Sequence, residues 1–307
     1  MPILEVNDLS ISFNQYVSGL RQQQLNVISS LDVSLEKSEI LAVVGASGSG
    51  KSLLAHAILG ILPSNAQVSG TIKFEGEELT PQRHAEVRGK EIALIPQSVN
   101  FLDPLMHVGK QVQQSVKKGN AKKVQREVFD RLQLGEEVDK MYPFQLSGGM
   151  ARRVLLSTSV VSDAKLIIAD EPTPGLDPVV IEEALQNFRE FADQGHTVMF
   201  ITHDIESALT IADKIAVFYA GTTVEVASVA DFYGDGEALR HPYSKALWNA
   251  LPQNGFTPLP GSQPYPSALP PGCLFAPRCE WATEACTLKQ PDMRELRDGM
   301  VRCIHAT

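Results

Sequence analysis

Residues 45–52 read Gly45-Ala46-Ser47-Gly48-Ser49-Gly50-Lys51-Ser52, which matches the pattern G-x-x-x-x-G-K-[ST] of a phosphate-binding loop. The apolar run 40–44 before it predicts a buried strand, and the run 53–59 after it predicts a helix. Glycines let backbone N–H groups turn inward around phosphate oxygens, and the helix presents its positive N-terminal end to the same anion. The residues expected to bind the phosphates are Gly45, Ser47, Gly48, Ser49, Gly50, Lys51 and Ser52. We expect Lys51 to reach the β- and γ-phosphates and the Ser52 hydroxyl to bind Mg²⁺.

Two more apolar runs, residues 166–169 and 198–201, predict strands of the same parallel sheet, and each leads into polar residues. Ligands of open α/β sheets bind beyond the carboxyl ends of the strands. Asp170 and Glu171 follow the first run; Asp170 suits a Mg²⁺ contact, and Glu171 is placed to act as general base for an attacking water. His203 follows the second run, where a γ-phosphate contact is expected. Each could alone be an ordinary strand end, but the phosphate loop upstream favours the catalytic interpretation.

Outside this core, the pattern predicts three further parts. Alternating apolar residues in 4–13, 31–35 and 68–74 predict a small antiparallel β subdomain. Residues from about 105 to 160 are rich in helix formers and predict a helical subdomain inserted between sheet strands. Seven of the 19 prolines lie between Pro252 and Pro271, which predicts a linker or a chain laid extended over a surface.

The stretch Leu146-Ser147-Gly148-Gly149-Met150 resembles the LSGGQ signature of ABC ATPases. The other motifs of that family occur in their usual order, and the resemblance covers about residues 3–235. It implies that Ser147, Gly148 and Gly149 expose backbone N–H groups to the γ-phosphate held by an opposing subunit, so that ATP lies between two subunits. Met150 departs from the usual glutamine, and methionine here is typical of the peptide and nickel importer branch.

The same resemblance implies further roles. Gln97 would contact Mg²⁺ and the attacking water as a catalytic residue, and Asp177 would contact the partner subunit. Phe13 would stack on adenine; the alternatives are that Phe13 is an ordinary core residue and that Tyr16 does the stacking. The implied fold is an α/β P-loop NTPase core of the ABC ATPase type, with an antiparallel β subdomain and a helical subdomain at about residues 98–160. We expect this nucleotide-binding domain to span residues 1–235 and a cysteine-bearing C-terminal extension to span 236–307.

All four cysteines, Cys273, Cys279, Cys286 and Cys303, fall in the last 35 residues, which indicates that they act as a set. Their spacing, C-x5-C-x6-C-x16-C, is not the C-x2-C pairing of a zinc ribbon, whereas four thiolates satisfy one [4Fe–4S] cluster. The segment from His241 to Cys303 resembles the C-terminal extension of oligopeptide, dipeptide and nickel importer ATPases, some of which carry such a cluster. We expect a [4Fe–4S] cluster; free thiols and zinc stay open, and a reducing cytosol disfavours a disulfide.

Charge and hydropathy limit the function. The net charge of −9 argues against a general nucleic-acid binder. No apolar run of about 18 residues is present to span a bilayer, and the first residues lack the layout of a signal peptide. The resemblance therefore implies an ATP-hydrolysing subunit bound peripherally at the cytoplasmic face of the cell membrane, which powers import of peptides or of nickel or metal chelates.

The partners that the resemblance implies are a second, paralogous ATPase subunit, two transmembrane permeases and an extracytoplasmic solute-binding protein, and no nucleic acid. The alternative is a soluble ABC ATPase that acts on ribosomes or DNA. Translation-type members usually carry two ATPase domains and DNA-repair types insert long coiled coils. This sequence has room for one domain and has no heptad pattern, so both types are disfavoured.

Overall fold

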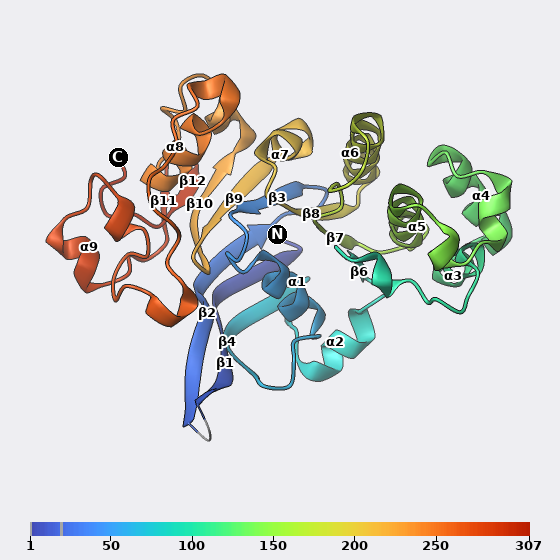
Figure 1. The fold of residues 1–307 in the computed structure, drawn as a ribbon, viewed down its shortest axis with the longest axis horizontal. Coiled ribbons are helices and arrows are strands. Elements are labelled where there is room, and N and C mark those ends of the chain that lie inside the picture. The colour runs from blue at the N-terminus through green and yellow to red at the C-terminus, as the bar shows by residue number, and fades with distance from the viewer. Residues whose placement is uncertain (1, 19–20) are drawn as a thin grey trace.

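Two β-sheets organise the chain in the computed structural model, which describes residues 2–18 and 21–307 (Figure 1). Within these residues the larger sheet has eight strands in the order β11-β12-β10-β9-β3-β8-β7-β6, and the smaller has four in the order β2-β1-β4-β5. The predicted α/β class with an added antiparallel sheet is confirmed.

The centre of the larger sheet is parallel. Its strands are β3 (Ile40–Gly45), β6 (Ile92–Ile95), β7 (Leu166–Asp170), β8 (Thr197–Thr202) and β9 (Lys214–Tyr219). The register pairs Val44 of β3 with Thr202 of β8, and Asp170 of β7 with Ile201 of β8. The carboxyl ends of β3, β7 and β8 therefore meet at one edge, where ligands of such sheets bind. Helices α6 (Pro178–Asp193) and α7 (Ile205–Ile211) cover one face of this sheet.

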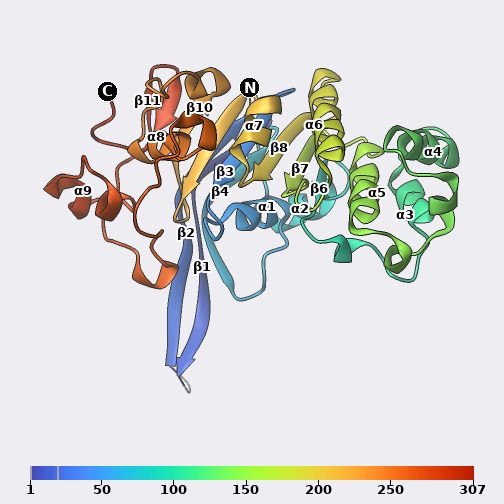
Figure 2. The same cartoon turned by 45° about the horizontal axis from the view of Figure 1, so that its top comes forward.

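The smaller sheet is antiparallel and lies over the opposite face. It consists of β1 (Leu4–Ser18), β2 (Arg21–Leu35), β4 (Ala66–Phe74) and β5 (Glu77–Glu78), and α2 (Pro81–Val87) follows it. Helix α1 (Lys51–Leu59) lies between the sheets, because its Leu54 and Ile58 share one core cluster with Leu4 of β1 and Ile201 of β8. The far end of the β1–β2 pair projects from the body of the molecule (Figure 2).

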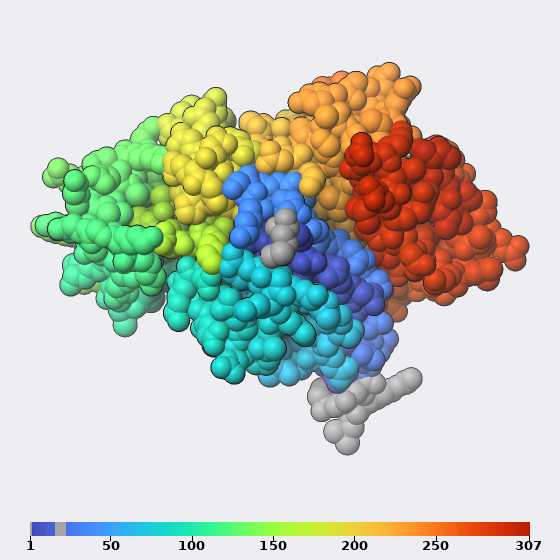
Figure 3. Space-filling view, turned by 180° about the vertical axis from the view of Figure 1, so that it is seen from behind, coloured from blue at the N-terminus to red at the C-terminus, as the bar shows by residue number. Residues whose placement is uncertain are grey.

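Residues 99–160 form a helical part at one end of the molecule, and the C-terminal segment lies at the opposite end (Figure 3). The elements of the helical part are η1 (Val99–Phe101), α3 (Val108–Ser115), α4 (Ala121–Arg131), η2 (Glu136–Lys140), η3 (Pro143–Gln145) and α5 (Gly148–Val160). The helical part has its own core cluster, which includes Val108, Val112, Phe129 and Val154. This part is thus a separate packing unit inserted between β6 and β7.

The C-terminal segment joins the larger sheet. Its elements are η4 (Val229–Phe232), α8 (Pro242–Asn249), η5 (Pro252–Asn254), η6 (Pro266–Ala268), η7 (Ala276–Arg278), α9 (Glu284–Leu288), β11 (Arg294–Leu296) and β12 (Gly299–Val301). Strand β12 pairs with β10 (Thr222–Ser228), which in turn pairs with β9. Phe275 also shares a core cluster with Val217 of β9. The extension is therefore continuous with the core sheet.

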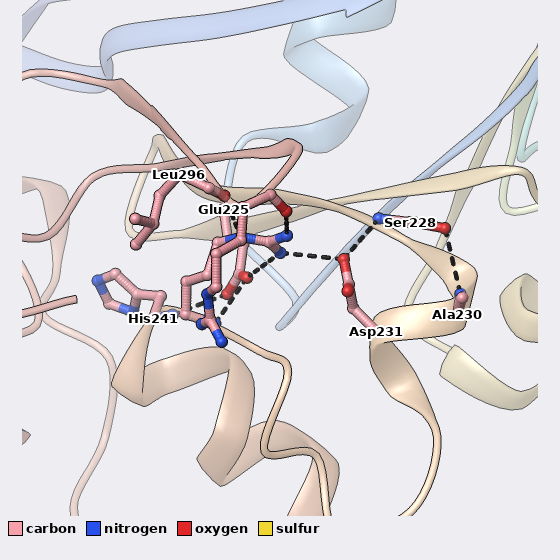
Figure 4. A network of polar contacts seen from close by, with 8 residues as sticks. Glu225, Ser228, Ala230, Asp231, His241 and Leu296 are labelled. Carbon is pink, nitrogen blue, oxygen red and sulfur yellow. Dashed lines mark hydrogen bonds and ion pairs between the residues drawn. The ribbon is translucent and has the colours of Figure 1, made fainter. Parts of the chain in front are cut away.

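A buried ionic network ties this segment down (Figure 4). The Glu225 carboxylate of β10 is fully buried and accepts hydrogen bonds from the backbone N–H groups of Arg240 and His241 at 2.8 and 2.9 Å. The Arg240 guanidinium lies 3.3 Å from Glu225 and 3.0 Å from Asp231, and its Nε donates to the Leu296 carbonyl at 2.5 Å. Four elements, β10, η4, α8 and β11, are thus held at one point.

Candidate active site

The phosphate loop connects β3 to α1. Gly45 approaches β9 so closely that a Cβ there would lie 2.5 Å from the Phe218 carbonyl oxygen, so only glycine fits. Gly50, the residue before α1, has φ 95°, in the region that glycine adopts readily. The buried Lys51 donates from Nζ to the carbonyl oxygens of Gly45 and Ala46, at 2.8 and 3.2 Å. Burial lowers the pKa of Lys51, against the opposing effect of the carboxylates of Glu171 and Asp170.

Ser52 and Asp170 meet at the base of the loop. The Ser52 hydroxyl donates to Asp170 Oδ1 at 3.1 Å, which joins the first turn of α1 to the end of β7. Burial raises the pKa of Asp170, and the Ser52 hydrogen bond opposes this shift. One carboxylate and one hydroxyl suit Mg²⁺, which prefers oxygen ligands and takes the remainder from phosphates and water. These two residues therefore fit the predicted magnesium contact.

Glu171 has an unusual backbone and a specific side-chain partner. Its φ is 47°, although it is not glycine, and its N–H donates to the Ile201 carbonyl of β8 at 2.9 Å. Oε2 of the buried carboxylate lies 2.7 Å from Nδ1 of His203, whose side chain is 60% exposed. The two predicted catalytic residues are thus in direct contact, one buried and one open to the solvent.

A cavity of about 610 Å³ lies at this edge of the sheet, within the range for small-ligand sites. It is lined by Val27, Ala46, Ser47, Gly48, Gly50, Lys51, Ser52, Leu53, Gln97, Glu171 and His203. The structure therefore brings Gln97 to the phosphate loop, Glu171 and His203 across long sequence separations. Ala46 lies inside the loop motif and Leu53 directly follows it, so the motif itself could have indicated both, whereas Val27 of β2 carries no sequence signal for this position.

Phe13 and Ser49, both predicted to bind the nucleotide, do not line this cavity. Phe13 pairs with Leu25 and Ala66 in the smaller sheet and packs against the core, and it is not among the residues that line this cavity. The side chain of Tyr16 lies outside the described residues. Ser49 is fully buried, and its hydroxyl has no hydrogen-bond partner among the described residues. The Ser49 side chain is likewise not part of the cavity lining.

The signature residues lie on the surface. Ser147 caps α5, with its Oγ accepting from the Met150 N–H at 3.3 Å. Gly148 and Gly149 begin the helix, and a Cβ built on Gly148 would meet nothing within 4 Å. Ser147, Gly148 and Asp177 are exposed, and none of them lines the phosphate-loop cavity of the same chain. The signature is therefore accessible at the surface and lies outside the phosphate-loop cavity of its own chain.

The four cysteines line one small cavity together with His241, Phe275 and His305. The thiols are free, Cys286 and Cys303 are buried, and the Cys273 N–H donates to the Cys286 carbonyl at 2.7 Å. Burial raises the pKa of Cys273 and of Cys279, which favours thiols over thiolates. Across residues 2–18 and 21–307, no group of three or more His, Cys, Asp or Glu is arranged to hold a metal ion. The cysteines converge, but their geometry does not support the predicted cluster.

Among the helices of residues 2–18 and 21–307, none combines the length and the apolar composition that a membrane span requires.

Residues 28–174 match the family model described as ABC transporter, and residues 224–286 match the one described as oligopeptide/dipeptide transporter, C-terminal region. The oligopeptide transport ATP-binding protein AppD of Bacillus subtilis is 32% identical over 322 residues, which cover 98% of this chain and 96% of the relative. OppD of Haemophilus influenzae is 33% identical over 323 residues, with 98% and 96% covered.

A putative peptide import ATP-binding protein of Brucella abortus is 32% identical over 321 residues, with 98% of this chain and 94% of the relative covered. Among solved structures, the ATP-binding cassette MJ0796, in a dimeric post-hydrolysis state bound to ADP and Pi, has a TM-score of 0.65 at 22% identity, covering 74% of this chain and 98% of that chain. At this identity the likeness establishes the fold. The chain is therefore an ABC transporter ATPase and belongs to the group of ATP-binding proteins that carry the oligopeptide/dipeptide transporter C-terminal region.

Proposed function

We propose that this chain is the energy-supplying subunit of a peptide importer, bound peripherally at the cytoplasmic face of the membrane. The observation that carries the proposal is that Lys51, Gln97, Glu171 and His203, from four separate segments, line one cavity. Relatives named for peptide or oligopeptide transport match almost the whole chain, the extension included. This supports peptides as the solute over nickel or metal chelates, and it supports transport over an action on ribosomes or DNA.

In the proposed reaction, the chain supplies four functions. The backbone of loop 45–50 binds phosphate oxygens, and Lys51 exchanges its bonds to the loop carbonyls for the β- and γ-phosphates. Ser52 and Asp170 hold Mg²⁺, which neutralises phosphate charge. Glu171 accepts a proton from the attacking water, and the His203 ring, 2.7 Å from Oε2 of Glu171, orients this carboxylate and contacts the γ-phosphate.

The remaining cavity residues complete this proposal. Gln97 contacts Mg²⁺ and the water. Val27 and Leu53 are the larger apolar side chains of the cavity, so we propose that they contact the nucleotide base, on which Phe13 would stack from the neighbouring strand. The proposed division of the chain is a nucleotide-binding domain of residues 1–235, with a helical subdomain at about 98–160, and an extension of residues 236–307.

A second subunit is needed to complete each site. Ser147, Gly148 and Gly149 are open to the surface and do not line their own cavity, so we propose that they bind the γ-phosphate in a paralogous ATPase partner. Asp177, also exposed, contacts the same partner. Phe101 and Leu105 follow Gln97 and are 61% and 86% exposed, which supports a docking surface for a permease. In the assembled importer two permeases would receive peptide from a solute-binding protein.

A separable proposal concerns the extension, where Cys273, Cys279, Cys286 and Cys303 would ligate one [4Fe–4S] cluster. Their convergence on one cavity supports this proposal, and their spacing in the structure, which is not that of a metal site, opposes it. Anaerobically prepared protein should then contain iron and acid-labile sulfide, about four of each per chain. If the protein contains zinc and no iron, the four cysteines form a zinc site instead of a cluster. If it contains neither metal, they are free thiols.

The importer function is tested in proteoliposomes that contain the chain, its ATPase partner and the permeases, with the solute-binding protein outside. Labelled peptide should enter only when MgATP is supplied on the ATPase side, and excess unlabelled peptide should compete. The same vesicles with Glu171→Gln should not accumulate peptide. Uptake of a nickel chelate with no uptake of peptide would reassign the solute, and ATP hydrolysis that neither permease nor solute stimulates would contradict transport.

A further inference from the structure

The backbone of Glu171 needs support from its neighbours. Its φ of 47° lies in the left-handed region, which residues with side chains rarely adopt. Such conformations persist only where the surrounding structure holds them. The N–H side of Glu171 is held by the Ile201 carbonyl of β8 at 2.9 Å. The carbonyl side is held by a residue from a different part of the chain.

That residue is Arg152, whose Nη1 donates to the Glu171 carbonyl oxygen at 3.2 Å. Arg152 lies in the second turn of α5, the helix that begins with the signature glycines. The next residue, Arg153, points elsewhere, since its Nη1 donates to the Leu132 carbonyl at 3.2 Å within the helical part. Two consecutive arginines on one helix thus reach in two directions, and only Arg152 bonds to the strand that carries the catalytic carboxylate.

We propose that Arg152 is a positioning residue, which makes the placement of Glu171 depend on the position of the signature helix in the same subunit. This inference rests on the proposed role of Glu171 as general base. A shift or rotation of α5 moves the guanidinium away from the Glu171 carbonyl, and the strained backbone then loses one of its two restraints. The carboxylate in turn loses its alignment on His203, which lies 2.7 Å from Oε2.

The consequence is communication between two nucleotide sites. The first turn of α5 carries the residues proposed to bind ATP in the partner, and its second turn holds the base of its own site. Closure of the signature onto the partner's nucleotide therefore fixes α5 and, through Arg152, sets Glu171 for hydrolysis in the same chain. Each subunit becomes active only when its signature is engaged.

The test compares Arg152→Met with Arg153→Met in the assembled transporter. Methionine keeps much of the side-chain volume and removes the donors. Arg152→Met should lower kcat for ATP hydrolysis about 10- to 100-fold, the size expected for a misplaced catalytic group, with the Kd for ATP changed less than about twofold. Arg153→Met should have the wild-type kcat when the rate is divided by the concentration of folded protein, even if this variant is less stable to heat. Arg152→Lys, which retains a donor, should recover part of kcat.

Two outcomes overturn the inference: an unchanged kcat in Arg152→Met, or equal losses of kcat in the two methionine variants. If Arg152→Met does not fold, Arg152→Gln, too short to reach the carbonyl, is judged by the same criteria. Glu171→Gln is measured beside them. Loss of hydrolysis in Glu171→Gln with normal kcat in Arg152→Met refutes only the positioning role, whereas normal hydrolysis in Glu171→Gln refutes the proposed function itself.

Discussion

Replacing Arg240 with methionine should strongly destabilise the chain. Glu225 is fully buried and would keep the two backbone N–H donors, but it would lose the only guanidinium within 4 Å of it in the described chain. Asp231 would lose its ion pair, and the Leu296 carbonyl would lose its donor. Removal of one partner from a buried ion pair typically costs about 3–5 kcal/mol, because the other charge stays buried without compensation.

Urea denaturation followed by circular dichroism measures this loss, with Lys118→Met as the matched control. Lys118 lies 2.6 Å from Asp163, but both side chains are largely exposed and screened by solvent, so removing Lys118 should change the stability very little. Adding Glu225→Gln to Arg240→Met should recover part of the stability, since a neutral amide is cheaper to bury than a carboxylate. Equal stabilities for Arg240→Met and Lys118→Met would refute the reasoning.

Three further predictions concern the site and the pH response. Glu171→Gln should lower hydrolysis by about 10²–10⁴ while ATP still binds, as measured by phosphate release and by equilibrium binding; a wild-type rate would exclude Glu171 as the base. Lys51→Ala should weaken ATP binding to the isolated chain, whereas Ser147→Arg should leave that binding intact and stop turnover in the assembled complex; normal turnover would exclude a composite site. Burial lowers the pKa of His241 to about 3 from an ordinary value of about 6.5, so the unfolded state binds a proton that the folded state does not. The free energy of unfolding should therefore fall as the pH drops from about 6.5 towards about 3, and His241→Asn should reduce this pH dependence. If the dependence of the unfolding free energy on pH is the same in His241→Asn, the assignment to His241 is contradicted.

Contiguous motifs were readable from the sequence because their chemistry is local. A strand, a glycine turn and a helix N-terminus follow one another within residues 40–59, so the pattern predicts both the fold and the phosphate site there. The same holds for Asp170 and Glu171, which end one strand. Their order along the chain then sufficed to predict the parallel sheet and the catalytic edge.

Contacts between distant segments were not readable. Arg152 and Glu171 are 19 residues apart and meet only because α5 packs onto the larger sheet, where its Leu156 shares a core cluster with Ile95 of β6. Glu225 and Arg240 have the residue types of an exposed surface, yet both are buried because each compensates the other. The resemblance predicts an adenine contact at Phe13, whereas nothing in the sequence indicated that Val27, from the neighbouring strand of the smaller sheet, lines the cavity. Cysteine spacing predicted a set, but not the distances between its thiols.

The pairing of β12 with β10 limits how the chain can be recombined with its relatives. A chimaera joined at residue 235 would bring a foreign β12 against this β10, and a foreign loop against the buried Glu225. Both the strand register and the single carboxylate would have to match, and a mismatch leaves an open sheet edge of the kind that promotes aggregation. A junction before β10, at about residue 220, transfers β10, β12 and the buried carboxylate with its arginine together, and of the strand pairings described above only that of β10 with β9 then crosses the junction. Swaps at that point should yield soluble protein more often than swaps at the apparent end of the nucleotide-binding domain.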